Sequence, residues 1–253
     1  MTTFGSLNRA LLFAAVARAC GPFTPASPPP RPVSINALAT SLNRPFETTR
    51  RNVIALVDAN LLVRNDAGVS APLSALSDPV TSTFTDRCHD LLVRLIEDAM
   101  AAALKVPAAR KGICYDPRLG TGVALDLLLS AVGSHDRRES NWTRQAVLLA
   151  VEWSSARYGG NAQGTGVKTS VIARLLGMPY ATTSRHADAL VRRGLLERGP
   201  DGLGPIKAAG RDARDELRDR GRFLLNRLAQ TGFVADRAGD AYIARRPALP
   251  VLG

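Results

Sequence analysis

The sequence predicts a mainly α-helical protein that carries small β-hairpins and repeats one set of elements. Three observations lead to this class. The chain is 45% hydrophobic but only 5% aromatic, a profile that suits packed helices. Apolar residues recur at helical spacing through most of its length. A stretch of 30 residues also occurs twice, and both copies end in short apolar runs joined by a Gly/Asp turn.

The repeat is gapless. Residues 39–68 align with residues 173–202 at an offset of 134, and 13 of the 30 pairs are identical. Similarity continues on both sides, since 8–16 resembles 143–151 and 86–95 resembles 219–228. A fixed offset with this many matches indicates an internal duplication.

Each copy predicts the same elements in the same order: a long helix, a short helix, a second helix, a hairpin and a closing helix. In the first copy these lie at about 6–19, 34–42, 45–58, 61–72 and 84–105. In the second they lie at about 138–157, 169–176, 179–193, 195–206 and 211–230. Proline opens the second helix of each copy, where its missing N–H has no partner to lose.

The remaining organisation follows from the repeat. Residues 122–132 predict an extra connecting helix, so the expected domains are 1–120 and 138–253, joined by 121–137. The apolar start, NRALLFAAVARAC, is similar to a leader peptide, but its counterpart lies deep inside the chain. We therefore expect residues 6–19 to form a domain helix.

Charge points to a polyanionic partner. The net charge is +11 and the isoelectric point is about 10.5. Residues 1–133 hold 13 basic against 10 acidic residues, or +3, whereas residues 134–253 hold 20 against 12, or +8. The second half therefore carries most of the expected electrostatic footprint.

A helix, a tight turn, a second helix and a hairpin form a winged helix-turn-helix. The second copy, IARLLGMPYATTSRHADALVRRGLLER, resembles the DNA-binding core of bacterial MarR- and IclR-type regulators. In the first copy Asn43-Arg44 replaces Gly-Met, and Asp58-Ala59-Asn60 replaces Arg-Arg-Gly. The resemblance implies tandem winged helices arranged as a MarR-like pseudo-dimer, with the flanking helices at the interface.

The second helix of each copy would enter the major groove of double-stranded DNA. We expect Arg51 and Arg185 to contact bases and Thr48 and Thr182 to position the helices; phosphate contact or a solvated surface is the alternative for the arginines. Arginines at the helix end and wing would reach phosphates, or only serve the structure. The candidate DNA-binding residues are Arg44, Glu47, Thr48, Arg50, Arg51, Asn52 and Arg64 in the first copy, and Thr182, Ser184, Arg185, His186, Arg192, Arg193, Arg198 and Lys207 in the second.

The sequence shows no motif for metal binding, catalysis or phosphate binding. The three cysteines and three histidines have no metal-ligand spacing, and no catalytic arrangement or phosphate loop stands out. We expect no enzymatic activity, no cofactor and no metal. Trp142 and Trp153 could line an effector pocket, but core or interface packing is the better explanation, as it is for Phe46 and Tyr180. No apolar run spans a bilayer, and we expect the three cysteines to be reduced, in a cytoplasmic, nucleoid-associated protein.

The sequence therefore predicts a sequence-specific transcription regulator that reads an imperfect inverted repeat, as a monomeric pseudo-dimer or as a homodimer. The alternatives are a plasmid replication initiator, a nonspecific chromosome-organising protein and a winged-helix protein-interaction module. The second half could also bind DNA while the first serves assembly.

Overall fold

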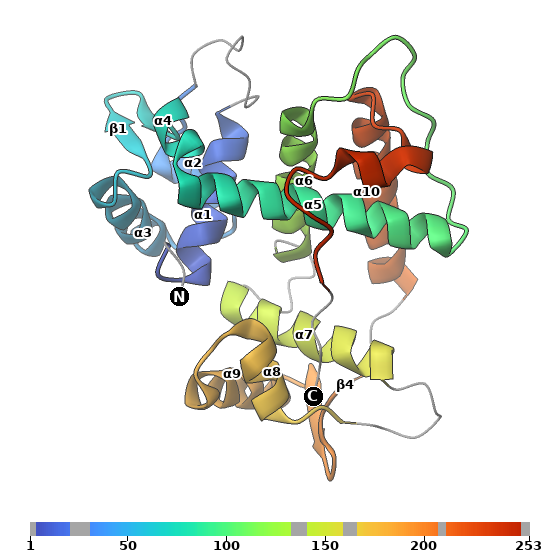
Figure 1. The fold of residues 1–253 in the computed structure, drawn as a ribbon. Helices are drawn as coiled ribbons and strands as arrows, with labels where there is room; N and C mark the ends of the chain where they lie inside the picture. The colour runs from blue at the N-terminus through green and yellow to red at the C-terminus, as the bar shows by residue number, and fades with distance from the viewer. Residues whose placement is uncertain (1–3, 21–30, 133–140, 159–165, 207–210, 249–253) are drawn as a thin grey trace. The chain divides into compact units, whose positions relative to one another are not determined.

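A computed structural model of the chain describes residues 4–20, 31–132, 141–158, 166–206 and 211–248 (Figure 1). The described residues are mainly helical and include two antiparallel hairpins, which confirms the predicted class. The chain divides into two compact units. Unit 1 comprises Met1–Gly133 and Leu217–Ala248, and unit 2 comprises Ser134–Glu216 and Leu249–Gly253.

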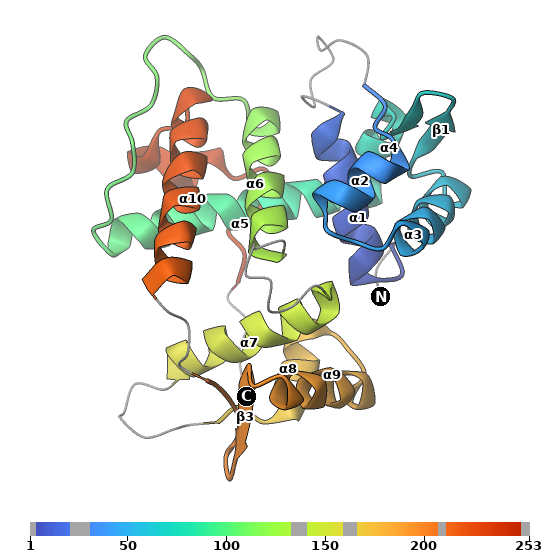
Figure 2. The ribbon, with the colours of Figure 1, turned by 180° about the vertical axis from the view of Figure 1, so that it is seen from behind.

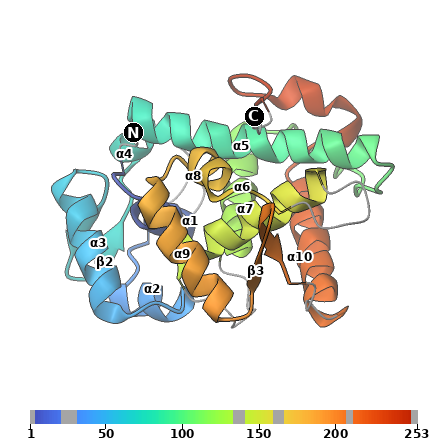
Figure 3. The same cartoon turned by 90° about the horizontal axis from the view of Figure 1, so that it is seen from below.

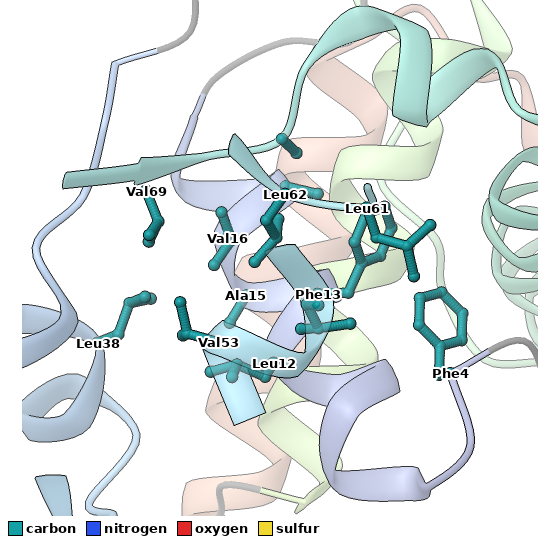
Figure 4. Close-up of a cluster of buried hydrophobic side chains, with 13 residues drawn as sticks. Phe4, Leu12, Phe13, Ala15, Val16, Leu38, Val53, Leu61, Leu62 and Val69 are labelled. Carbon is teal, nitrogen blue, oxygen red and sulfur yellow. The ribbon is translucent and has the colours of Figure 1, made fainter. Parts of the chain in front are cut away.

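Unit 1 begins with three helices and a hairpin, in the order of a winged helix-turn-helix. Its elements are α1 (Leu7–Ala19), α2 (Ile35–Ser41), α3 (Phe46–Asp58), β1 (Val63–Asn65) and β2 (Gly68–Ser70). Serines start the first two helices, because Ser6 accepts a hydrogen bond from the Arg9 N–H and Ser34 accepts one from the Ala37 N–H. Figure 4 shows side chains of α1, α2, α3 and the hairpin pointing into one apolar cluster, with Phe13, Val16 and Val53 fully buried.

A helical layer completes unit 1. Its elements are α4 (Leu73–Ser77), α5 (Pro79–Ala101), α6 (Pro117–Val132), the part of α10 (Arg211–Gln230) from Leu217 onward, and the 3₁₀ helix η1 (Ala235–Ala241). Figures 1 and 2 show α5 crossing α6 and α10. The second core lies there, and it includes Val93, Ile96 and Leu228. Asp126 of α6 joins this layer to α1, since it pairs with Arg18 at 2.7 Å and also with Arg227.

Unit 2 has three helices and a hairpin in the same order. Its elements are α7 (Trp142–Tyr158), α8 (Thr169–Leu176), α9 (Tyr180–Arg192), β3 (Leu196–Gly199) and β4 (Gly202–Pro205). Figures 1 and 3 show α8 packed against α9, with the hairpin beyond the end of α9. Trp142 is buried, as packing predicts, and the Arg157 guanidinium lies over the half-buried Trp153 ring.

The cores of the two winged helices use equivalent positions. Eight buried residues form the described cluster of unit 2, and each has a buried counterpart 134 or 135 positions earlier in the cluster of unit 1. The pairs are Leu12/Val147, Ala15/Ala150, Val16/Val151, Leu38/Ile172, Val53/Ala187, Leu56/Leu190, Leu62/Leu196 and Val69/Leu203. The aligned residues therefore occupy equivalent positions in the apolar core of each unit.

The structure differs from the sequence prediction in the helical layer. A short helix, α4, precedes α5, and α5 begins at Pro79 because Asp78 accepts a hydrogen bond from the Val80 N–H. The segment predicted as a connector, 121–137, begins with the last turns of α6, which pack in the core of unit 1. Residues 217–248 also pack in unit 1. The repeat instead predicts that they belong to the second domain, 138–253.

Candidate nucleic-acid interface

The turn between the two helices has the same backbone in both units. Gly177 ends α8 in the left-handed conformation, with φ of 60°, and Asn43 takes φ of 50° at the equivalent place. Past the next helix, Gly194 and Asn60 repeat this pairing, with φ of 67° and 57°. After glycine, asparagine is among the residues that best tolerate this region. The first copy thus departs from the motif in sequence while keeping its geometry.

Both second helices begin in the same way. Pro45 and Pro179 are the N-cap residues of α3 and α9, in nearly identical conformations. Four residues on, the hydroxyl groups of Thr49 and Thr183 donate to the carbonyl oxygens of these prolines, at 3.1 and 3.2 Å. Because these threonines are buried, they fix which face of each helix turns inward.

The predicted inward and outward faces are confirmed. Thr49, Val53 and Leu56 of α3 are buried, as are Thr183, Ala187 and Leu190 of α9. The opposite faces are exposed or half-buried, and they carry Glu47, Thr48 and Arg51 on α3 and Ala181, Thr182 and Arg185 on α9. The structure therefore leaves the predicted base-reading arginines open to a partner.

The α9 surface is basic at both ends. Arg185 is exposed, and half-buried Thr182, Ser184 and His186 adjoin it. Arg192 and Arg193 are exposed at the other end of the helix. In the wing, the Arg198 Nη2 lies 2.6 Å from the Asp188 carboxylate of α9, so this arginine is already paired. Lys207 lies outside the described residues.

The α3 surface is held by ion pairs of its own. The Glu47 carboxylate accepts hydrogen bonds from Arg50 Nε and Nη2, both at 2.8 Å, and from Arg51 Nε at 3.0 Å. These hydrogen bonds lower the pKa of Glu47 to about 2, so the carboxylate is ionised at neutral pH. The Asn52 amide donates to the Thr48 carbonyl oxygen at 2.8 Å.

Two other candidates of unit 1 lie apart from this cluster. The half-buried Arg44 turns back toward α1, where its Nη2 lies 3.5 Å from Asn8 Oδ1, a position that favours a structural role. Arg64 is exposed on β1. The structure thus groups Glu47, Thr48 and Arg51 on one surface, with Arg50 and Asn52 beside them.

Each wing is anchored to the strand-like residue before its helix-turn-helix. Val33 bridges Val69, and Val167 bridges Leu203, in antiparallel pairs. Gly68 and Gly202 lie beside these bridges with φ of 139° and 129°. A Cβ atom at either glycine would come within 2.5 Å of a valine carbonyl oxygen. The wing needs glycine there because the backbones approach so closely.

Sequence reasoning missed one pair of candidates. Phe46 and Tyr180 were expected to pack, but they are 49% and 59% exposed at the first position of α3 and α9. An aromatic residue directly after the turn proline in both copies was the available signal. Exposed rings at this end of the helix could contact thymine methyl groups or deoxyribose.

Cys20, Cys88 and Cys114 are free thiols, and no group of three metal-ligating side chains occurs among the described residues. No helix in the described part of the chain is long and apolar enough to cross a membrane.

Residues 161–200, which contain α8, α9 and the first strand of the wing, match the IclR helix-turn-helix domain. This segment is similar to the DNA-binding domain of IclR-type proteins. The match supports a DNA-binding transcription regulator with double-stranded DNA as partner. No curated protein and no solved structure matches the chain significantly.

Proposed function

We propose that this protein is a sequence-specific transcription regulator in which one chain reads two half-sites of an imperfect inverted repeat. The observation that carries the proposal is the IclR-type helix-turn-helix at 161–200, together with the equivalent winged helix of unit 1. In this proposal the chain acts by binding, without catalysis.

Several features support a duplicated reader. The two winged helices share the wing glycines, the capping prolines and threonines, and the eight core pairs. Dimeric regulators read palindromes because protein symmetry mirrors operator symmetry. A duplicated chain supplies both readers alone, as a MarR-like pseudo-dimer, and its half-sites would lie about one helical turn apart.

The outward faces of α3 and α9 predict unequal half-sites. Glu47 stands opposite Ala181 in the alignment, and Ile54 stands opposite Asp188. Arg51 and Arg185 are the common element, and arginine is the commonest reader of guanine. Each half-site should therefore contain a guanine at the same step, within otherwise different sequences.

Selection of bound duplexes from a random pool tests the proposal. We expect the purified chain to enrich a two-part motif at near-physiological salt. Arg51→Ala and Arg185→Ala should each relax one guanine position, in different halves, at a cost of about 1–3 kcal/mol. Binding without enrichment, fading steeply with salt, would indicate a nonspecific DNA-organising protein. Absence of binding would favour a protein-interaction module.

A further inference from the structure

The two candidate reading helices differ in charge although they share a fold. α3 carries Arg50 and Arg51 against Glu47 and Asp58, and so has no net charge. α9 carries two arginines against Asp188 alone, and a third arginine, Arg193, is its C-cap. Because phosphate attraction grows with the number of cations presented, the two helices would meet DNA with unequal strength.

Glu47 adds to this difference in charge, because it also binds both arginines of α3. Its carboxylate takes Nε and Nη2 of Arg50 as a fork and Nε of Arg51 as a third donor. A forked arginine–carboxylate pair is the same geometry in which arginine binds a phosphate. Arg50 must therefore release Glu47 before it can hold the DNA backbone in that way.

Arg51 is held less completely. Only its Nε is bonded to Glu47, and among the described residues no other hydrogen bond or ion pair involves its two terminal nitrogens. Its side chain is 76% exposed. The ion pair therefore orients Arg51 outward and leaves two donors for the paired acceptors on a guanine edge.

Unit 2 lacks this arrangement. Ala181 occupies the position equivalent to Glu47, and no described residue forms an ion pair with the exposed Arg185. The acidic residue of α9, Asp188, pairs instead with Arg198 of the wing. Arg185 can consequently meet any phosphate or base without first breaking a contact.

On the basis of the proposed function, we propose that Glu47 is a specificity-determining residue that withholds Arg50 and Arg51 from the DNA backbone. The α9 helix then supplies more of the nonspecific attraction than α3, and α3 binds the DNA backbone only where a matching half-site frees Arg50 from Glu47. Glu47 acts through the two arginines and is a positioning residue rather than a base contact.

The test measures the affinity of the full chain for its selected duplex and for an unrelated duplex across a range of salt concentrations. Glu47→Ala should tighten binding to the unrelated duplex about 3- to 10-fold and steepen the logarithmic salt slope by about one. The preference for the selected duplex should fall correspondingly. Ala181→Glu should do the reverse in unit 2, weakening unrelated DNA about 3- to 10-fold.

Asp58→Ala is the matched control, because it removes one negative charge from the far end of α3 without touching the arginine pair. Glu47→Gln retains a hydrogen-bonding side chain, and thermal unfolding of each variant reports whether the fold persists. Equal effects of Glu47→Ala and Asp58→Ala, or no effect of either, would overturn the inference. So would a loss confined to one base pair of the selected site, since Glu47 would then contact that base. If the unmodified chain binds no DNA, the proposed function fails first.

Discussion

At single positions, the two copies show which features the winged helix demands and which it leaves free. Asn43 and Asn60 stand where the second copy has Gly177 and Gly194, and all four residues take a positive φ. Asparagine tolerates this conformation because its short amide can bond to the local backbone. The motif of the first copy is thus weaker in sequence than in structure.

The exposed rings offer a prediction for single residues. Tyr180→Ala should change the free energy of unfolding by less than about 0.5 kcal/mol, because the ring is 59% exposed. The affinity of the Tyr180→Ala variant for the selected duplex should fall several-fold, because the contact of the ring with a sugar or a thymine methyl group is lost. Phe46→Ala should behave alike. Phe223→Ala, which removes a ring of α10 that is 61% exposed, is the control for both in a titration by fluorescence anisotropy.

His89 gives unit 1 a pH-dependent stability. Burial lowers the pKa of His89, although Asp90 and Asp86 oppose that shift; its Nδ1 lies 3.2 Å from Asp90 Oδ1 and its Nε2 lies 2.6 Å from the Tyr115 hydroxyl. The folded pKa is therefore below the unfolded value of about 6.5. Below that pH the unfolded chain binds a proton that the folded chain does not, so stability falls as pH decreases.

Urea unfolding between pH 7.5 and 5.5 measures this effect. The unmodified chain should lose stability across the window, and His89→Gln should lose less. The same loss in both proteins would show that another group titrates. Asp90 is not expected to respond there. Although desolvation opposes the shift, hydrogen bonds from the backbone N–H groups of 243–245 and from His89 lower its pKa.

At the scale of elements, the wings depend on one close backbone approach. Gly202→Ala should destabilise unit 2 by about 1–3 kcal/mol, because a Cβ atom would come within 2.5 Å of the Val167 carbonyl oxygen at a φ of 129°. Gly68→Ala should do the same in unit 1, beside Val33. Chemical denaturation of each variant measures the cost.

Gly199→Ala is the control for the wing, since a Cβ atom there meets nothing within 4 Å. It should change the stability of unit 2 by less than about 0.5 kcal/mol. If Gly199→Ala and Gly202→Ala cost the same, the bridge between Val167 and Leu203 does not restrain the wing.

Elements that repeat were predictable, and elements that do not repeat were harder to place. The sequence places α2, α3, α8 and α9 within two residues, because proline, glycine and the apolar spacing mark both ends. The helix α4 was missed, since five residues carry too little periodicity. The bridge from Val33 to Val69 joins residues far apart in sequence, which no local pattern reveals.

The candidate surface shows the same division. The outward face of α9 followed from helical spacing, so Arg185 and Thr182 lie where expected. Side-chain pairing did not follow, because whether Glu47 holds Arg50 or Asp188 holds Arg198 depends on rotamers and on the position of the wing. The exposure of Phe46 and Tyr180 was not predicted, because large aromatic side chains are highly buried on average.

At the scale of the whole molecule, the chain divides into two units of different composition. Unit 1 holds 20 basic against 13 acidic residues, or +7, and contains the second apolar core. Unit 2 holds 13 basic against 9 acidic residues, or +4, and contains the segment that matches the IclR helix-turn-helix domain. Residues 217–248 belong to unit 1, where the Asp90 carboxylate accepts hydrogen bonds from the backbone N–H groups of Ile243, Ala244 and Arg245. The two helix-turn-helix segments are therefore alike, whereas the elements that flank them differ.

The central claim is that one chain reads both half-sites, and the stoichiometry of the complex tests it most directly. The mass of the complex on its selected duplex should correspond to one chain per two-part site, with hydroxyl-radical protection over both halves. Arg51→Ala should remove protection from one half and Arg185→Ala from the other. Two chains on a symmetric site, each protecting it through α9 alone, would contradict the account.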